Sequence, residues 1–393
     1  MQIKPILFSA SLAFTFAAPA AAQFTTPGMP TWGQTSQTTR FDNDYNPAIG
    51  FLLDSFAGYH TADDHSLNGI DSGLTAGEIT ISTWVDPKAW AYGVIVFDEE
   101  GVGLEEGAVH YVGFDGNETI RIGRFFVDFG KQMQMHQHQL RTPVRPAVLS
   151  EYLGAELGGD GIQFDDWFTM GDDTIVRFSI AAFQSLSVFE SEDGPMAVSP
   201  DSPQPDQLAF TARLTGFSSL TDQQTLQLGA SLRSVPDFTI VDEESGASAE
   251  NLDNNVWGLD ATWGWADDTN TKTWTAGGEF LVNTGDLNGT VSEPVPGTFV
   301  LSALNDTATG YYAFVDHAWN RYDSAGLQYS SLETASTGLP TLSETVAYYT
   351  HKLSEFQRLR FAITNRDLDG QQDTSFGIQY SAFMGPHSHG LNF

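Results

Sequence analysis

Apolar residues recur at every second position in segment after segment of this chain, and this pattern constrains its fold more than any other feature. In the segment 206–217, Leu208, Phe210, Ala212 and Leu214 alternate with polar or small residues. Successive side chains of a β-strand point to opposite faces of the sheet, so the pattern predicts strands with one apolar and one polar face. The expected strands lie at 47–59, 73–86, 88–98, 106–114, 119–129, 159–169, 173–184, 206–217, 223–234, 253–266, 271–283, 307–319, 322–331, 343–353, 356–366 and 373–385.

The polar faces of these strands distinguish two classes of all-β protein. They carry mostly Gly, Ser, Thr, Gln and Arg and few Lys, which suits a crowded aqueous lumen better than a face in bulk water. After the first 22 residues no apolar run is long enough to predict a transmembrane helix. We therefore predict an all-β fold, a transmembrane antiparallel β-barrel of about 16 strands, because such barrels have even strand numbers and no unpaired edges. Aromatic residues expected in a girdle at the membrane interfaces are Trp84, Trp90, Trp257, Trp265, Trp274 and Trp319.

The first residues predict export. Residues 1–22 combine a basic residue, a short apolar stretch and an Ala-Ala-Ala cleavage site, as in a secretory signal peptide. Residues 23–45 show no period and are interpreted as a periplasmic N-terminal lead, and residues 46–393 as the outer-membrane β-barrel. We expect the protein in the bacterial outer membrane, with the aromatic end at Phe393 recognised by the barrel-assembly machinery.

The charge of the chain limits its partners. The formal net charge is -33, which argues against nucleic acid. The expected surroundings are outer-membrane lipid and lipopolysaccharide, and the expected cargo is small solutes. Four acidic stretches are interpreted as outer loops, which either bind divalent cations that bridge lipopolysaccharide or are merely solvated. They lie at 185–205, 235–252, 284–304 and 332–342.

One connection is too long for a turn in a regular barrel. The segment 130–158 carries Lys131, Arg141 and Arg145 together with apolar residues that need burial, such as Val148. Periplasmic turns of such barrels are short, so the segment should start on the outer side. We predict that it folds into the barrel as a constriction loop.

Seven arginines are expected to face the passage, five of them by strand alternation and two from the long segment. A ring of arginines at a narrowing favours anions. The alternative is that they pair with lumen carboxylates such as Asp260 and Glu279, and the sequence leaves both open. The predicted pore-lining residues are Arg141, Arg145, Arg177, Arg213, Arg233, Arg358 and Arg360.

Two His-x-His pairs are the candidate metal ligands. Residues i and i+2 of a strand share a face, so both imidazoles of a pair can reach one ion. The sequence assigns no third ligand, and polar loop or strand-end positions explain the same residues. No cofactor is expected other than zinc or another divalent metal at these pairs, which are His136 with His138 and His387 with His389.

Several short motifs lie in the first half of the chain and at its C-terminus. They are Asn46-Pro47-Ala48-Ile49, Val85-Asp86-Pro87-Lys88-Ala89-Trp90-Ala91, Gly123-Arg124-Phe125, Phe129-Gly130, Met135-His136-Gln137-His138, Arg145-Pro146-Ala147-Val148-Leu149, Gly161-Ile162-Gln163-Phe164 and Gly385-Pro386-His387-Ser388-His389. Together they resemble a group of porin-like outer-membrane proteins, distantly similar to the phosphate-selective O/P porins, of which some members are labelled zinc-regulated. The resemblance implies a porin-like barrel but no particular solute, because the lysine-rich lining of phosphate porins has no counterpart here.

The sequence therefore predicts an outer-membrane porin-like channel for passive diffusion of small hydrophilic solutes, with an anion preference or a relation to metals left open. No catalytic residue and no enzyme activity are predicted, since the chain has no G-x-S-x-G, H-E-x-x-H or P-loop motif. Two alternatives stay open, an outer-membrane barrel hydrolase and a non-channel surface β-protein. The sequence is compatible with a monomer and with a homotrimer.

Overall fold

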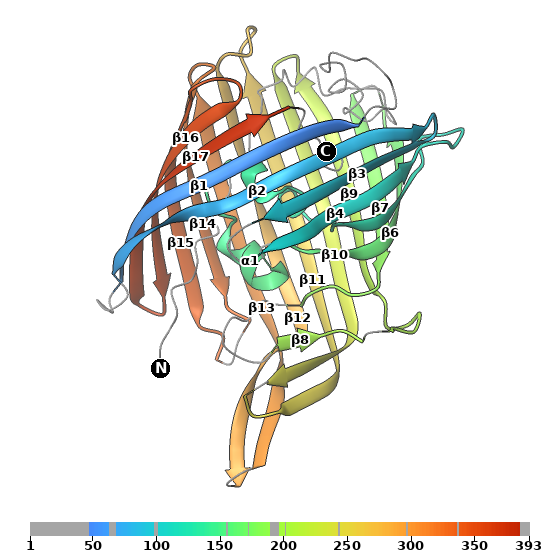
Figure 1. Cartoon of the computed structure of the whole chain (residues 1–393), viewed down its shortest axis with the longest axis vertical. Helices are drawn as coiled ribbons and strands as arrows, with labels where there is room; N and C mark the ends of the chain where they lie inside the picture. Colours follow the sequence, from blue (N-terminus) through green and yellow to red (C-terminus); the bar gives the residue numbers. More distant parts are fainter. Residues whose placement is uncertain are drawn as a thin grey trace.

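The alternating segments form strands, seventeen in the described part of the chain (Figure 1). The computed structural model describes residues 47–62, 68–97, 101–154, 156–171, 173–188, 196–200, 202–242, 244–295, 298–335 and 338–385. The predicted signal peptide (1–22), the N-terminal lead (23–45), His387, His389 and Phe393 lie outside the described residues. The strands are β1 (Ala48–Ala62), β2 (Gly69–Asp86), β3 (Ala89–Phe97), β4 (Val102–Tyr111), β5 (Thr119–Phe126), β6 (Gly158–Thr169), β7 (Thr174–Phe183), β8 (Met196–Val198), β9 (Ala209–Thr221), β10 (Gln224–Asp242), β11 (Ala247–Ala266), β12 (Thr273–Val295), β13 (Thr298–Ala318), β14 (Asp323–Glu333), β15 (Thr341–Lys352), β16 (Gln357–Leu368) and β17 (Gln371–Met384).

Sixteen of these described strands close into one antiparallel barrel. Each pairs with the strands before and after it, and β1 pairs with β17 to complete the ring. The short strand β8 pairs only with the far end of β10, so β7 pairs directly with β9. The predicted fold class and strand number are confirmed.

Alternation gives the barrel an apolar outer surface and a polar inner one. On β9, Thr211 and Arg213 are buried inside the barrel, whereas Leu214 between Arg213 and Thr215 is 51% exposed. On β10, Gln227 is buried and Leu228 is 53% exposed. Apolar side chains exposed in this regular way around a barrel are unfavourable in water and favourable in lipid.

Two predicted outer loops are strands instead. Residues 235–252 fall almost entirely in β10 and β11, and residues 284–304 fall in β12 and β13. The pairing register shifts between Val235 and Phe238 and between Leu287 and Thr290. Such bulges interrupt strict alternation, so the strand ends predicted from alternation came too early in the sequence. Figure 1 shows that β12 and β13 continue beyond the barrel as a long hairpin.

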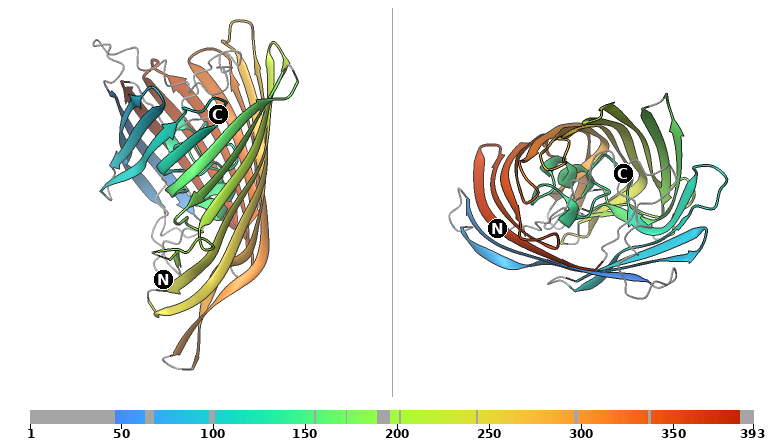
Figure 2. Two further views of the ribbon diagram at one scale, coloured as in Figure 1. Left: turned by 90° about the vertical axis from the view of Figure 1, so that its right-hand side faces the viewer. Right: turned by 90° about the horizontal axis from the view of Figure 1, so that it is seen from above.

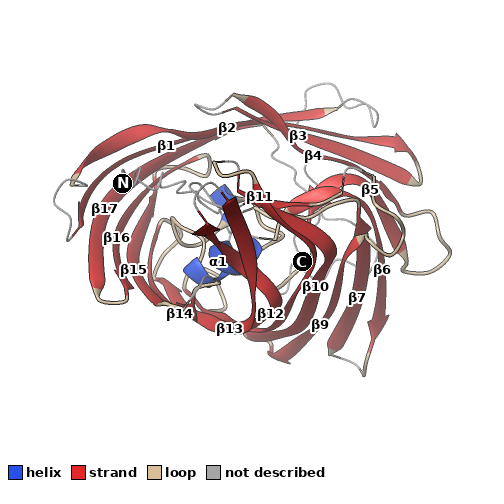
Figure 3. Cartoon of the chain, turned by 90° about the horizontal axis from the view of Figure 1, so that it is seen from below, coloured by secondary structure: helices blue, strands red, loops and turns tan. Residues whose placement is uncertain are grey.

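The segment between β5 and β6 lies inside the ring of strands. Figures 2 and 3 show its helix α1 (Ala147–Leu153) surrounded by the wall. Val148, Leu149 and Leu153 of this helix are fully buried and share one core with inward-facing apolar residues of the strands. Gly154 ends the helix with a φ of 80°, a conformation that favours glycine. No helix in the described part of the chain is long and apolar enough to cross a membrane.

The inward position of this segment explains two errors in the predicted aromatic girdle, at Trp90 and at Trp84, which lies directly opposite Trp90 on the neighbouring strand and packs against the same core. Trp90 is 2% exposed and stacks on Tyr92 inside the barrel, whereas Trp257 and Trp274 are exposed on the outside. Both Trp90 and Tyr92 belong to the core that contains α1. The strand β3 therefore turns an apolar row inward, because an apolar segment packs against it there.

The two faces predict opposite responses to charge. Leu228→Arg places a cation in the lipid and should lower the free energy of unfolding by about 2–4 kcal/mol near the bilayer midplane, whereas Gln227→Arg should be mild. Urea unfolding of the protein refolded in lipid vesicles measures both, and Leu228→Ala controls for lost side-chain volume. Equal losses for the two arginine variants would contradict the assignment of faces.

Candidate functional site

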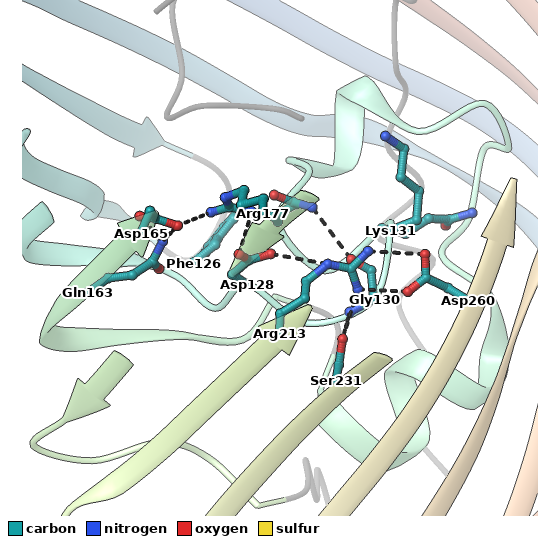
Figure 4. Close-up of polar contacts among 12 residues, drawn as sticks. Phe126, Asp128, Gly130, Lys131, Gln163, Asp165, Arg177, Arg213, Ser231 and Asp260 are labelled. Atoms are coloured by element: carbon teal, nitrogen blue, oxygen red, sulfur yellow. Dashed lines mark hydrogen bonds and ion pairs between the residues drawn. The ribbon is translucent and has the colours of Figure 1, made fainter. Parts of the chain in front are cut away.

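The segment 127–157 is tied to the barrel wall by its first residues (Figure 4). Asp128 is 1% exposed, and its carboxylate lies 2.6 Å from the Nη1 of Arg177 on β7 and 3.6 Å from the Nε of Arg213 on β9. Arg177 also pairs with Asp165 of β6. Burial alone would raise the pKa of Asp128, but Arg177 and Arg213 outweigh it and hold this pKa below its usual value. The Asp128 carboxylate is therefore ionised and compensated by both arginines.

Arg213 connects the segment to two further strands. Its Nη1 and Nη2 donate to the carboxylate of Asp260 on β11 at 2.8 and 3.0 Å, and its Nη1 also donates to Ser231 Oγ on β10 at 2.8 Å. The backbone N–H of Gly130 donates to the same Ser231 Oγ at 3.0 Å. Ser231 thus carries the contact between the arginine and the backbone of the segment.

Gly130 is required by its conformation and by its surroundings. Its φ is 55°, in the left-handed region that favours glycine. A Cβ at this position would lie 1.9 Å from the Oε2 of Glu279 on β12. The Oε1 of the same carboxylate accepts hydrogen bonds from the Lys131 N–H at 2.8 Å and from the hydroxyl of Tyr312 at 2.7 Å. Gly130 therefore lets the chain turn directly over this acceptor.

Lys131 brings a titratable charge to the segment. Burial lowers its pKa to about 8, with a further contribution from the positive charge of Arg213. Asp260 and Glu279 act in the opposite direction, and Arg141 adds to the lowering. In Figure 4 the Lys131 side chain extends away from the pair of Arg213 and Asp260.

Three of the predicted pore-lining arginines hold the backbone of the segment. Arg145 donates to the carbonyl oxygens of Gln132 and Met135 at 2.5 and 2.8 Å. From β16, Arg358 donates to the carbonyl of His138 at 2.8 Å, and Arg360 donates to the carbonyl of Leu140 at 3.2 Å. These guanidinium groups donate hydrogen bonds to peptide oxygens that would otherwise be buried inside the barrel without a partner.

The structure brings all seven predicted arginines inside the barrel, but to unequal exposure. Arg233 donates to the carbonyls of Ser187 and Val188 and to the side chain of Asn254. Arg141 lies 3.6 Å from Asp316 of β13 and keeps 28% of its side chain exposed. The other six, Arg145, Arg177, Arg213, Arg233, Arg358 and Arg360, are at most 4% exposed. A pore-lining role for these residues stays a prediction.

His136 lies between two adjacent glutamates of β4. Its Nδ1 is 3.1 Å from Glu105 Oε2 and its Nε2 is 2.6 Å from Glu106 Oε1. The imidazole is 1% exposed. Burial alone would lower the pKa of His136, but Glu105 and Glu106 raise it well above its usual value. The two carboxylates therefore favour the protonated form of the imidazole.

His138 comes close to His136 in a way that the sequence did not predict. It lies in a 3₁₀ helix, η4 (Gln137–Gln139), so the expected strand geometry for this pair is wrong. The two imidazole centroids are nevertheless 5.6 Å apart, and His138 Nδ1 is 2.8 Å from Glu78 Oε1 of β2. The turn, rather than a strand face, brings the rings together.

Several residues of this interior were not predicted from the sequence. Asp128, Glu78, Glu105 and Glu106 lie on or against the segment, and none was singled out. The one local signal was the pair of adjacent acids Glu105 and Glu106 at the edge of a predicted strand. In a regular strand only one of two neighbours faces inward, so the other carboxylate would face outward. The remaining contacts join strands far apart in the sequence.

The hydrolase alternative directs attention to one other pair. His351 Nδ1 lies 2.7 Å from Asp323 Oδ1 at the end where β13 and β14 are joined by a short turn. The hydroxyl of Tyr349 and the side-chain amide of Asn320 donate to the same carboxylate. These contacts organise the turn and supply no nucleophile.

No protein-family model and no curated protein matches the chain. Solved structures of outer-membrane proteins do match it in fold. An anion-selective porin from Comamonas acidovorans is 9% identical with a TM-score of 0.57, covering 86% of this chain and 99% of that chain. OprB of Pseudomonas putida at high pH is 10% identical with a TM-score of 0.56, covering 87% and 94%. A loop-deletion mutant of OmpT, an outer-membrane protein of Vibrio cholerae, is 12% identical with a TM-score of 0.51, covering 86% and 99%.

At these identities the likeness shows the fold alone, and the resemblance to the phosphate-selective O/P porins stays a prediction. The fold is the closed sixteen-strand barrel of outer-membrane porins. The outward rows of apolar side chains, of which Leu214 and Leu228 are examples, require lipid around the barrel. The protein is accordingly a lipid-facing transmembrane β-barrel with the fold of these porins.

Proposed function

We propose that the protein is a channel for passive diffusion of small hydrophilic solutes, narrowed by the segment 127–157. One observation carries the proposal: side chains from many different strands hold this segment inside the barrel. Glu279 on β12, Arg358 on β16 and Glu78 on β2 bind it at separate points. A loop that only covered one end of the barrel would not need partners around its circumference.

The polar inner rows support a hydrophilic cargo. Strand after strand turns Thr, Ser, Gln or Arg inward, and these groups can replace part of the water around a polar solute. The proposed preference for anions should be weaker than the number of arginines suggests, because the buried arginines face carboxylates or carbonyls. It depends mainly on Arg141, whose side chain is the most exposed of the seven.

Removing part of the segment should widen the passage. Deleting residues 134–146 takes out the portion held by Arg358 and Arg360, and single-channel conductance in planar bilayers should rise. Shortening the part of β12 and β13 that extends beyond the barrel serves as control and should leave conductance unchanged. Unaltered conductance in the 134–146 variant would refute a narrowing role, and no conductance in either form would refute a channel.

Arg141 should influence selectivity. Changing Arg141→Gln removes an exposed positive charge from the passage, so the reversal potential in a salt gradient should shift towards cation preference. Lys272→Gln removes the same charge from the turn between β11 and β12 and should have a smaller effect. An equal shift in both variants would indicate a general surface-charge effect instead.

Selectivity should also depend on pH through Lys131. Its pKa of about 8 means that the ammonium is charged below pH 8 and loses its charge above it. Raising the pH from about 7 to about 9 should therefore shift the reversal potential towards cations. Lys131→Met should abolish this step, and a pH step of the same size in that variant would show that another group is responsible.

A further inference from the structure

Three potential metal ligands from separate parts of the chain meet inside the barrel. Glu78 of β2, Glu105 of β4 and His136 of the segment 127–157 each offer a ligand atom, and these atoms all lie within 4.8 Å of one another. Glu78 and His136 are 5% and 1% exposed at their side chains, and Glu105 is 13% exposed. The cluster is therefore enclosed, with Glu105 on its accessible side.

A local irregularity of β4 creates this arrangement. Val94 of β3 pairs with Glu106, but the next residue, Ile95, pairs with Leu104, so Glu105 is an extra residue in β4. In a regular strand Glu105 and Glu106 would point to opposite faces, and one of them would face the lipid. The bulge turns both carboxylates towards the two nitrogens of His136. Bulges that re-aim a side chain in this way are frequent beside functional sites.

Neighbouring groups fix the orientation of two of the three residues, His136 and Glu78. The hydroxyl of Tyr92 donates to Glu106 Oε2 at 2.8 Å, and the other oxygen of Glu106 contacts His136 Nε2. His138 Nδ1 contacts Glu78 Oε1 at 2.8 Å. Groups of this kind, which orient ligands without binding the ion, contribute strongly to metal affinity.

We propose that Glu78, Glu105 and His136 bind a divalent transition-metal ion such as Zn²⁺. A mixed set of imidazole and carboxylate ligands suits zinc and neighbouring transition metals better than Mg²⁺ or Ca²⁺, which prefer oxygen ligands alone. Bonds of about 2 Å to a tetrahedral ion place ligand atoms roughly 3.3 Å apart. Rotation of the three side chains can shorten the distances between their ligand atoms to this value. Glu106 and His138 stay beside the ion.

Such an ion would link the segment to two strands of the wall. Glu78 and Glu105 belong to β2 and β4, whereas Asp128 and Gly130 tie the same segment to the region of β7, β9 and β10. The ion would therefore hold the segment from the opposite side of the barrel. Metal binding itself does not depend on the proposed channel function and can be tested without ion flow.

The test uses Zn²⁺ alone, titrated into the refolded chain in competition with a fluorescent zinc chelator. His387→Gln with His389→Gln is present in every sample, so that this second pair cannot contribute. We expect one ion per chain, and at least about tenfold weaker binding in Glu105→Gln and in His136→Gln. His351→Gln, which removes a histidine from a turn at one end of the barrel, should bind as tightly as the parent. Heat-modifiable gel mobility confirms that each variant is folded.

A second measurement does not depend on any variant folding. Zn²⁺ should slow amide hydrogen exchange of the parent protein in the segment 127–157 and in β2 and β4, and leave the hairpin of β12 and β13 unchanged. No saturable binding by the parent would overturn the proposal, because a protonated His136 between two glutamates would then account for the cluster. Equal affinity in His136→Gln, or protection spread evenly over the barrel, would overturn it as well.

Discussion

The ion pairs of Asp128 with Arg177 and Arg213 fix the point at which the chain leaves the barrel wall, and the rest of the interior depends on them. All three groups are buried, and removing one partner of a buried pair costs about 3–5 kcal/mol because a charge is left uncompensated. From this point Gly130 turns in the left-handed conformation, and the following N–H group reaches Glu279. The path of the segment is therefore determined by hydrogen-bond acceptors and charged side chains of the wall, which its successive residues contact in turn.

An inward-facing arginine in this barrel can bind the buried segment instead of lining a passage. A segment buried in a barrel must find partners for its peptide groups, because little water reaches them. A guanidinium offers five donors in a rigid fork, so Arg358 and Arg360 can serve this need from positions that alternation correctly places inside, and Arg145 does so from within the segment. Only charges that reach the aqueous path act strongly on a passing solute. In the proposed channel, the field along the passage would therefore depend more on exposed groups such as Arg141 than on the number of arginines in the strands.

The wall of the barrel could be predicted from the sequence because one face of each strand must be apolar, and a slip of one residue would reverse every side chain. Prediction failed where that requirement is lifted. The hairpin of β12 and β13 extends beyond the barrel with bulges, so its residues no longer alternate strictly. Trp90 faces inward because α1 supplies an apolar surface inside, and no pattern within β3 itself indicates this. The burial of Val148 and Leu149 was predicted, since apolar residues in a basic segment have no other shelter.

The cluster of Glu78, Glu105 and His136 could not be predicted from any local sequence pattern. Glu78, Glu105 and His136 meet only because the barrel closes and because a bulge in β4 reverses one side chain. The same geometry couples this cluster to the exposed charge of the segment. Arg358 and Arg360 bind the carbonyls of His138 and Leu140, and Leu140 directly precedes Arg141. Any displacement of the backbone over these few residues moves the imidazoles and the Arg141 guanidinium together. Whatever fixes the histidines therefore also fixes the position of this exposed charge inside the barrel.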